Sequence, residues 1–483
     1  MAIEDVLYPL AHRYIDAPGW LKASAGQAYS WIPRRARLGE AYCRFRAELC
    51  ATRTPQAAAA LAREKLRATL QWAMETVPAY RSYRLFARTD DPVRLLSRMP
   101  ITDKLDIKRS PEMYLSRAMP GSQRLRMVTG GTSRNPLEFW LQKHVTRAKE
   151  ACFIEDFRRR VGAQPGELTL SLRGRNVPDA SRPGGKLWTR EPIKAQLIFS
   201  PNHLAERHMP RFAEALVRYR PRFVEAFPSM LLPLARWLAK NPLPEFTRAV
   251  AGVMLYSENV HGLQMELFRR VFGCPVLKHY GHSERVLMAA SMPDDDRYFF
   301  WPQYGWFELV DFDDQPIRRP GVLGQIIGTS FDNRIMPFVR YRTGDTAVLC
   351  GSEHSSLRGY PVCERIEGRL QEFLVDASQR LVSLSRIGAA HLPAFSEVDS
   401  LQYEQSRPGE LLLKYVASPS FSSEAQQRMA STVARTTGCT VRLARVQNIE
   451  RTPAGKQCML IQRLDIRRYL GRTALVEDAH ASL

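Results

Sequence analysis

The chain has 483 residues, of which 45% are hydrophobic and 25% are charged. This composition is ordinary for a folded protein and excludes a largely disordered chain, which would be poorer in apolar and aromatic residues. Lysines and arginines outnumber aspartates and glutamates by 70 to 49, giving a formal net charge of +21. The excess is scattered in short arginine-rich groups without a zinc-finger, bZIP or RRM pattern, so no specific nucleic-acid partner is expected.

The sequence also bears on where the protein works. No stretch approaches the roughly 18 to 20 apolar residues that a membrane-spanning helix needs, so no transmembrane segment is expected. Glu4 and Asp5 occupy positions where a signal peptide would carry basic residues, so a signal peptide is not expected. The eight cysteines form no Cys-x-x-Cys pair and lack zinc-site spacing. These features predict reduced thiols and a cytoplasmic location.

The first part of the chain is expected to be helical. Residues 55–76 are rich in Ala, Leu, Glu, Arg and Gln, which favour a helix. Thr102 or Asp103 is a candidate cap for a short helix that follows. The apolar positions between His144 and Arg160 fall near helical spacing and predict an amphipathic helix.

The rest of the chain alternates strands with helices. The apolar runs LTLSL, QLIFS, FVEAF and AGVMLYS are separated by helical stretches such as LLPLARWLAK. This alternation predicts an α/β domain with a mainly parallel sheet. After about residue 290 aromatic and β-branched segments broken by Asp-Asp and Pro-Gly turns predict a β-rich subdomain. From about residue 370 a strand, a helix and a strand predict a small α+β domain.

Two segments have residues suited to phosphate and base recognition. MVTGGTSRNP (127–136) combines glycines with hydroxyl residues and lies between a strand-like RLRMV and a later helix. This combination suits phosphate binding. The segment lacks the Walker A pattern, and a plain turn is the alternative. KHYGHSERV (278–286) offers Tyr280 for stacking on a base and Glu284 as an oxygen ligand for Mg²⁺.

Two further segments offer single charged side chains. In VRYRTGDTAVL (339–349), Asp345 follows a Gly turn, where its carboxylate can accept hydrogen bonds from two ribose hydroxyls or cap its own turn. In RTPAGKQCML (451–460), Lys456 lies in a turn and either meets a reacting phosphate or carboxylate or is solvated.

The order of these segments resembles the adenylate-forming ligase superfamily, and more narrowly its phenylacetate–CoA ligase and CapK-type branch. The supporting matches are WAMETVPAYR, AFPSM (226–230), YSEN (256–259) and IEGRLQEFLV (366–375). The resemblance runs from about residue 60 to 465. It implies a large N-terminal domain (1–369) that binds nucleotide and acid, including the β-rich subdomain, and a small mobile α+β lid domain (370–483).

The resemblance also implies roles for individual residues. The phosphate loop would wrap the triphosphate with Thr129, Gly130, Gly131, Thr132 and Ser133. Tyr280 would stack on adenine, followed by Gly281, while Ser283 would contact the α-phosphate and Glu284 would hold Mg²⁺ as a catalytic residue. Asp345 would hold the ribose with Arg369 beside it, and the catalytic Lys456 would bridge the carboxylate and the α-phosphate. The hinge of the lid domain would lie near Gln371.

The phosphate loop departs from the usual family pattern. Where that loop continues Gly-Lys-Pro, this chain has Arg134, Asn135 and Pro136. The family's lysine is therefore missing, and Arg134 is the candidate that would supply the positive charge, because a guanidinium stays charged and can contact two phosphate oxygens.

The implied activity is activation of a small carboxylic acid by ATP and Mg²⁺ to an acyl-adenylate, followed by transfer to CoA. Two alternatives remain open: a CapK-like enzyme of polysaccharide biosynthesis that transfers to an amine or hydroxyl, and a degenerate binder of nucleotide or polyanion without turnover. The altered phosphate loop and the charge of +21 favour the binder, whereas Glu284, Asp345 and Lys456 oppose it. A homodimer is left open.

Lys456→Ala is predicted to abolish adenylation while leaving a preformed acyl-adenylate usable in the second step. The reason is that this lysine lies in a closing Pro-Ala-Gly-Lys turn, on the domain expected to rotate away after the first step. Single-turnover assays of each half-reaction measure the two effects separately. Equal loss in both half-reactions would contradict the role.

Overall fold

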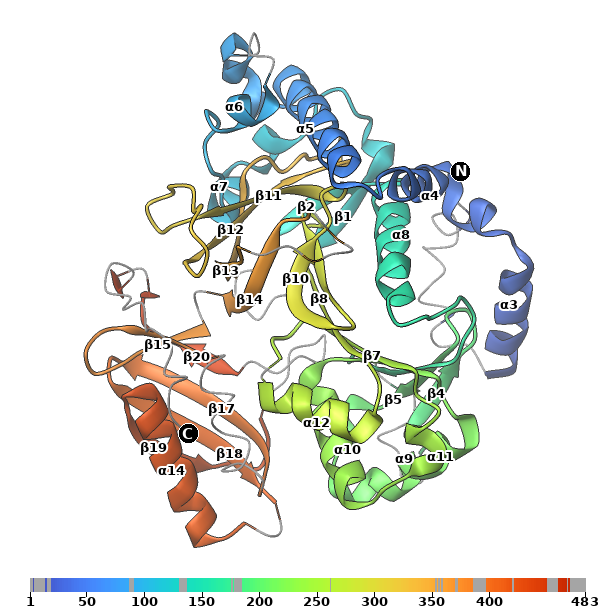
Figure 1. Ribbon diagram of the computed structural model, residues 1–483, viewed down its shortest axis with the longest axis vertical. Coiled ribbons are helices and arrows are strands. Elements are labelled where there is room, and N and C mark those ends of the chain that lie inside the picture. Colours follow the sequence, from blue (N-terminus) through green and yellow to red (C-terminus); the bar gives the residue numbers. More distant parts are fainter. Residues whose placement is uncertain are drawn as a thin grey trace.

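The computed structural model describes residues 3, 14, 19–86, 91–129, 137–174, 177, 185–260, 262–351, 354, 357, 359–369, 372–384, 397–418, 421–449, 459–466 and 468–469. Within these residues a twelve-stranded sheet runs through the large part of the molecule, and a four-stranded sheet formed by the C-terminal segment lies beside it (Figure 1). The chain is a mixed α/β protein, as the sequence predicts. No helix in the described ranges has both the length and the apolarity needed to cross a membrane.

The N-terminal segment is helical, with α3 (Gly19–Trp31), α4 (Arg34–Ala51), α5 (Pro55–Thr76), α6 (Pro92–Leu96) and α7 (Lys104–Arg109). The prediction of a helix over 55–76 is confirmed. It begins there because the Thr54 side chain accepts a hydrogen bond from the Ala57 N–H, with Pro55 in the first turn. Asp103 caps α7 through a capping box with Asp106. Of the two predicted caps, Thr102 and Asp103, the second is therefore confirmed.

One half of the large sheet is mainly parallel and consists of β3 (Thr169–Leu172), β5 (Gln196–Phe199), β6 (Phe223–Ala226), β7 (Gly252–Tyr256) and β8 (Val276–Gly281), with β4 (Trp188–Glu191) antiparallel at the edge. The helices among and before these strands are α8 (Thr146–Arg159), α9 (Met209–Tyr219), α10 (Pro228–Lys240), α11 (Pro244–Thr247) and α12 (Gly262–Phe272). Strands β3, β5, β6 and β7 are buried along their whole length, as expected for a sheet covered on both faces.

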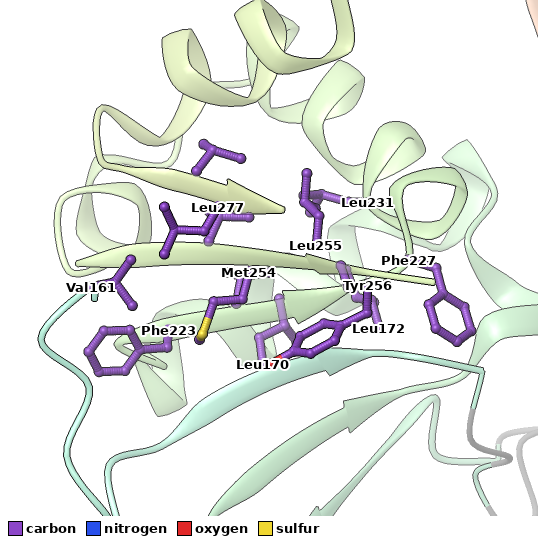
Figure 2. Close-up of a cluster of buried hydrophobic side chains, with 14 of the residues drawn as sticks. Val161, Leu170, Leu172, Phe223, Phe227, Leu231, Met254, Leu255, Tyr256 and Leu277 are labelled. Carbon is purple, nitrogen blue, oxygen red and sulfur yellow. The ribbon is translucent and has the colours of Figure 1, made fainter. Parts of the chain in front are cut away.

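Successive side chains of β7 point to opposite faces of the sheet and pack in two layers of one core (Figure 2). Leu255 lies with Leu277 and with Leu231 of α10 on the side of the helices above the sheet. On the opposite face the Tyr256 ring meets Phe157 of α8 edge to face, with ring centroids 5.7 Å apart. This packing holds the carboxyl ends of β6, β7 and β8 in register.

The other half of the large sheet is antiparallel. Its strands are β9 (Met288–Met292), β10 (Asp295–Phe300), β11 (Gly305–Val310), β12 (Leu323–Ser330), β13 (Tyr341–Leu349) and β14 (Val362–Arg369). This is the β-rich segment that the aromatic and β-branched composition predicts. It joins the parallel half through the antiparallel pair β8–β9, so the two halves form one continuous sheet.

The glycine and hydroxyl loop lies in an unexpected local setting. The sequence places this loop between a strand and a later helix, but a second strand intervenes. Strands β1 (Arg124–Val128) and β2 (Glu138–Gln142) pair antiparallel, and residues 130–136 between them lie outside the described residues. The later helix is α8, and β2 precedes it.

The C-terminal segment builds a separate core. After the hairpin of β15 (Phe373–Val375) and β16 (Leu381–Ser383) come β17 (Val398–Arg407), β18 (Glu410–Ala417), α14 (Ser423–Thr437), β19 (Thr440–Arg445) and β20 (Leu460–Gln462). Ser422 caps the start of α14, and Gly438 ends it in the left-handed conformation. Met429 and Val433 of this helix pack on Leu413 of β18. The predicted order of strand, helix and strand is present.

Gly305→Ala is predicted to lower the free energy of unfolding by about 3 kcal/mol, at the upper end for overpacking, because backbone atoms surround the site and cannot rotate away. A Cβ at Gly305 would lie 2.0 Å from the carbonyl oxygen of Val286 and 3.1 Å from that of Thr329. Urea unfolding measures the loss. Gly121→Ala is the matched control, since nothing lies within 4 Å of its Cβ position, and an equal effect of both substitutions would contradict the explanation.

Candidate functional site

Two of the sequence motifs meet at the carboxyl edge of the parallel strands. Ser229 follows β6, and Glu258 follows β7, its neighbour in the sheet. The Glu258 carboxylate accepts hydrogen bonds from the backbone N–H of Ser229 at 2.9 Å and from its hydroxyl at 3.0 Å. The segments AFPSM and YSEN are therefore joined at the edge where open α/β sheets bind their ligands.

The centre of the site is the Asp345 carboxylate, which contacts two other sequence-predicted residues. The Tyr280 hydroxyl, at the end of β8, donates a hydrogen bond of 2.8 Å to Asp345 Oδ2. Arg369 faces Asp345 across the β13–β14 ladder, with 3.6 Å between its Nε and Asp345 Oδ1. Burial, followed by the Asp345 charge, raises the pKa of Tyr280 well above its usual range, so the phenol keeps its proton and acts as a donor.

The turn before Asp345 explains the glycine of YRTGD. Gly344 has a φ of +82°, a conformation that favours glycine. The backbone N–H of Asp345 then donates to Thr343 Oγ1 at 3.1 Å, and the Thr343 hydroxyl donates to the Ile326 carbonyl at 2.9 Å. The local turn sets the direction of the Asp345 side chain.

Glu284, the predicted metal ligand, is 8% exposed and is held by one hydrogen bond, in which the Tyr341 hydroxyl donates to its Oε1 at 3.0 Å. Ser283 beside it is exposed, as contact with a ligand requires. Among the residues that the structure describes, no three His, Cys, Asp or Glu side chains gather as a metal cage. One buried carboxylate nevertheless fits Mg²⁺, which is commonly held by one or two carboxylates together with substrate phosphates.

Lys104 belongs to this cluster, and the sequence analysis did not assign it a function. Thr102, two residues earlier, bonds to the backbone of β13: its N–H donates to the Arg340 carbonyl at 3.0 Å and its carbonyl accepts from the Arg342 N–H at 2.8 Å. Lys104 is thereby placed where its charge interacts with Glu284 and Arg369. Burial, then the charge of Arg369, lowers its pKa, while Glu284 opposes the shift. No local pattern marks this lysine, because only the pairing with β13 brings it to the site.

The remaining predicted residues divide into two groups. Thr129 is described, and it closes the β1–β2 hairpin: its Oγ1 accepts from the Leu137 N–H at 2.8 Å, and its own N–H donates to the Leu137 carbonyl at 2.9 Å. Other predicted positions lie outside the described residues, namely Gly130, Gly131, Thr132, Ser133, Arg134, Gln371 and Lys456.

His279 precedes Tyr280 and packs against the opposite side of β8. Its ring packs against those of Phe157 and Tyr256, at centroid distances of 5.4 and 5.0 Å. A Cβ at Gly281 would approach this ring to 3.0 Å, which explains the glycine after Tyr280. Burial, followed by the charges of Arg173 and Arg160, lowers the pKa of His279 to about 3, so the ring is neutral at ordinary pH.

Comparisons with known proteins show what the chain is similar to in sequence and in fold. No family model matches the chain. It is 24% identical to the phenylacetate–coenzyme A ligase of Pseudomonas putida over 323 residues, covering 65% of this chain and 70% of that enzyme. It is also 24% identical over 328 residues to the phenylacetate–coenzyme A ligase of Escherichia coli K12, covering 65% of this chain and 72% of that one.

Solved structures share the fold. A 2-hydroxyisobutyryl-CoA ligase in the postadenylation state aligns with a TM-score of 0.63 at 20% identity, over 87% of this chain and 93% of that one. The chain is therefore similar in sequence to phenylacetate–coenzyme A ligases and shares its fold with a 2-hydroxyisobutyryl-CoA ligase. An acyl acid amido synthetase, AtGH3.15, aligns with this chain at a TM-score of 0.53 and 12% identity, over 86% of this chain and 93% of that one.

The protein is predicted to lose stability as the pH falls from 6.5 toward 3, in part through His279. The unfolded chain takes up a proton at this histidine near pH 6.5, whereas the folded chain does not until about pH 3. In His279→Phe the slope of unfolding free energy against pH should therefore fall by about 1.4 kcal/mol per pH unit between pH 4.5 and 5.5. Urea titrations across this range measure it, and parallel curves for the two proteins would contradict the burial of a neutral ring.

Proposed function

We propose that the protein activates a small carboxylic acid with ATP, forming an acyl-adenylate and pyrophosphate, and then transfers the acyl group to CoA. The observation that carries the proposal is the contact of Tyr280 and Arg369 with Asp345, which joins three motifs far apart in the sequence. The two phenylacetate–coenzyme A ligases support the same reaction, since each covers 65% of this chain.

In the first step the described residues would bind and orient ATP. Asp345 would accept hydrogen bonds from the ribose hydroxyls, and the Tyr280 ring would lie against adenine. Glu284 would hold Mg²⁺ together with triphosphate oxygens. An oxygen of the acid attacks the α-phosphorus, a new P–O bond forms, and the bond to the leaving pyrophosphate breaks. Catalysis would come from positioning and from cations facing the charge that develops.

The cations proposed for this step come from three parts of the chain. The charge of Lys104 interacts with those of Glu284 and Arg369, and Lys104 would compensate for the lysine that the phosphate loop lacks. Arg134 is proposed to contact phosphate from the loop itself. Lys456 is proposed to bridge the carboxylate and the α-phosphate from the C-terminal domain, which is proposed to begin at residue 370.

In the second step the thiol of CoA would attack the acyl carbon, so that a C–S bond forms, the bond to AMP breaks and the thiol proton is released. CoA is the proposed acceptor because both curated relatives are CoA ligases. An amine or a sugar hydroxyl, as in CapK-like enzymes, is the alternative that an acceptor screen would reveal. The need for ATP and CoA also supports the proposed cytoplasmic location.

The proposal is tested by acid-dependent exchange of labelled pyrophosphate into ATP, screened over a library of carboxylic acids with Mg²⁺ present. Exchange with one class of acid is the expected result. Nucleotide binding without exchange for any acid would instead support the degenerate binder.

Asp345→Ala is predicted to weaken ATP binding by about 1.5 to 3 kcal/mol, the range for hydrogen bonds to a charged group, or about 10- to 150-fold in the dissociation constant. Calorimetry measures the affinity directly. Asp314→Ala is the matched control. This carboxylate lies in an exposed ion pair with Arg342, which is on β13 like Asp345. Equal affinities of wild type and Asp345→Ala, with the fold intact, would remove Asp345 from the nucleotide site.

A further inference from the structure

Glu372 lies where the large sheet gives way to the C-terminal segment. It comes three residues after Arg369, the last residue of β14, and directly before β15. On the far side of Glu372, the Phe373 carbonyl accepts a hydrogen bond of 2.8 Å from the Gln462 side chain of β20. The carboxylate of Glu372 therefore stands between the nucleotide-site strands and the C-terminal sheet.

The Glu372 side chain folds back onto the end of β14. Its Oε2 accepts a hydrogen bond from the backbone N–H of Arg369 at 3.4 Å. A Cβ on Gly368 would lie 2.2 Å from that same oxygen and 2.7 Å from Asn259 Nδ2 of the YSEN segment, and Gly368 has a φ of +94°. Only glycine leaves room for this arrangement, so the corner at Gly368 is shaped around the carboxylate.

The charges around Glu372 belong to the site already described. The Arg369 guanidinium faces it from β14, Asp345 from β13, and Glu258 from the loop after β7. The pKa of Glu372 is raised to about 7, chiefly because the carboxyl group is removed from water. The charges of Asp345 and Glu258 act in the same direction, and the charge and backbone N–H of Arg369 oppose it. Arg369 thus stands between two carboxyl groups, one of which is predicted to hold the ribose.

We propose that Glu372 is a positioning residue of the nucleotide site, which holds the Gly368–Arg369 corner so that the Arg369 guanidinium stays beside Asp345. The inference rests on the proposed function, because it takes Asp345 and Arg369 as nucleotide contacts. The Glu372 oxygen fixes the Arg369 backbone, and the ladder with β13 places the side chain beside Asp345. Glu372 itself touches no nucleotide.

Two substitutions separate positioning from simple stability. In Glu372→Gln the amide oxygen still accepts from the Arg369 N–H, but the charge is lost. In Glu372→Ala both are lost. ATP binding by calorimetry at pH 6, 7 and 8 is the measurement, and thermal unfolding without nucleotide reports the fold. Glu404→Gln is the control, because this carboxylate pairs with Lys414 and Arg463 within the C-terminal sheet.

Glu372→Ala is expected to weaken ATP binding about tenfold at pH 7, the loss of one hydrogen bond to a charged group, while Glu372→Gln stays within about threefold of wild type. As the pH rises from 6 to 8, Glu372 becomes ionised and adds a negative charge beside the residues proposed to hold the ribose of the anionic nucleotide. The affinity of wild type relative to Glu372→Gln should therefore fall by about fivefold over this range.

Each outcome decides the inference. A constant ratio of wild type to Glu372→Gln across pH 6 to 8, together with an Ala variant that binds like wild type, would overturn the positioning role and leave the proposed function standing. Should the Ala variant fail to fold, the pH series of Glu372→Gln decides alone. A wild type that binds no ATP would overturn the proposed function and this inference together.

Discussion

The contact of Tyr280 and Arg369 with the Asp345 carboxylate is the interaction on which the candidate site depends. Tyr280 ends the parallel strand β8, whereas Asp345 and Arg369 face each other on the antiparallel strands β13 and β14. One carboxylate therefore ties the two halves of the large sheet together at the edge where the motifs meet. Any shift of β13 against β8 would separate the phenol from its acceptor, so the continuous sheet is a condition for the site.

The charge balance around that carboxylate explains how the site would accept a polyanion. Glu284, Asp345 and Glu372 lie near the cations Lys104 and Arg369. The carboxylates attract the two cations and so hold them in place. A bound nucleotide would add the negative charge of its triphosphate and the positive charge of Mg²⁺. Under the proposed function, these charges would be oriented before the nucleotide binds.

Much of the fold could be predicted because its signals are local. The helix over 55–76 follows from composition and its cap, and the strands of the parallel half are short apolar runs bounded by turns. Within the described part of the candidate site, Tyr280, Glu284, Asp345 and Arg369 were predicted from motifs of two to five residues, and their nucleotide-binding roles stay predictions. The hairpin strand β2 after the glycine loop was missed, because the segment LEFWLQ carries both apolar and polar residues without a distinct strand boundary.

The sequence by itself determined the elements, the order of the motifs and the residues with chemistry in them, since caps, turns and apolar periodicity act over a few neighbours. Only the tertiary structure decided which of those residues meet. Lys104 comes to Glu284 because Thr102 pairs with β13, more than two hundred residues away in the chain. Glu372 reaches the Arg369 N–H because Gly368 turns with a positive φ and leaves space beside Asn259. Contacts of this kind depend on strand register and close packing, and neither leaves a pattern in the neighbouring residues.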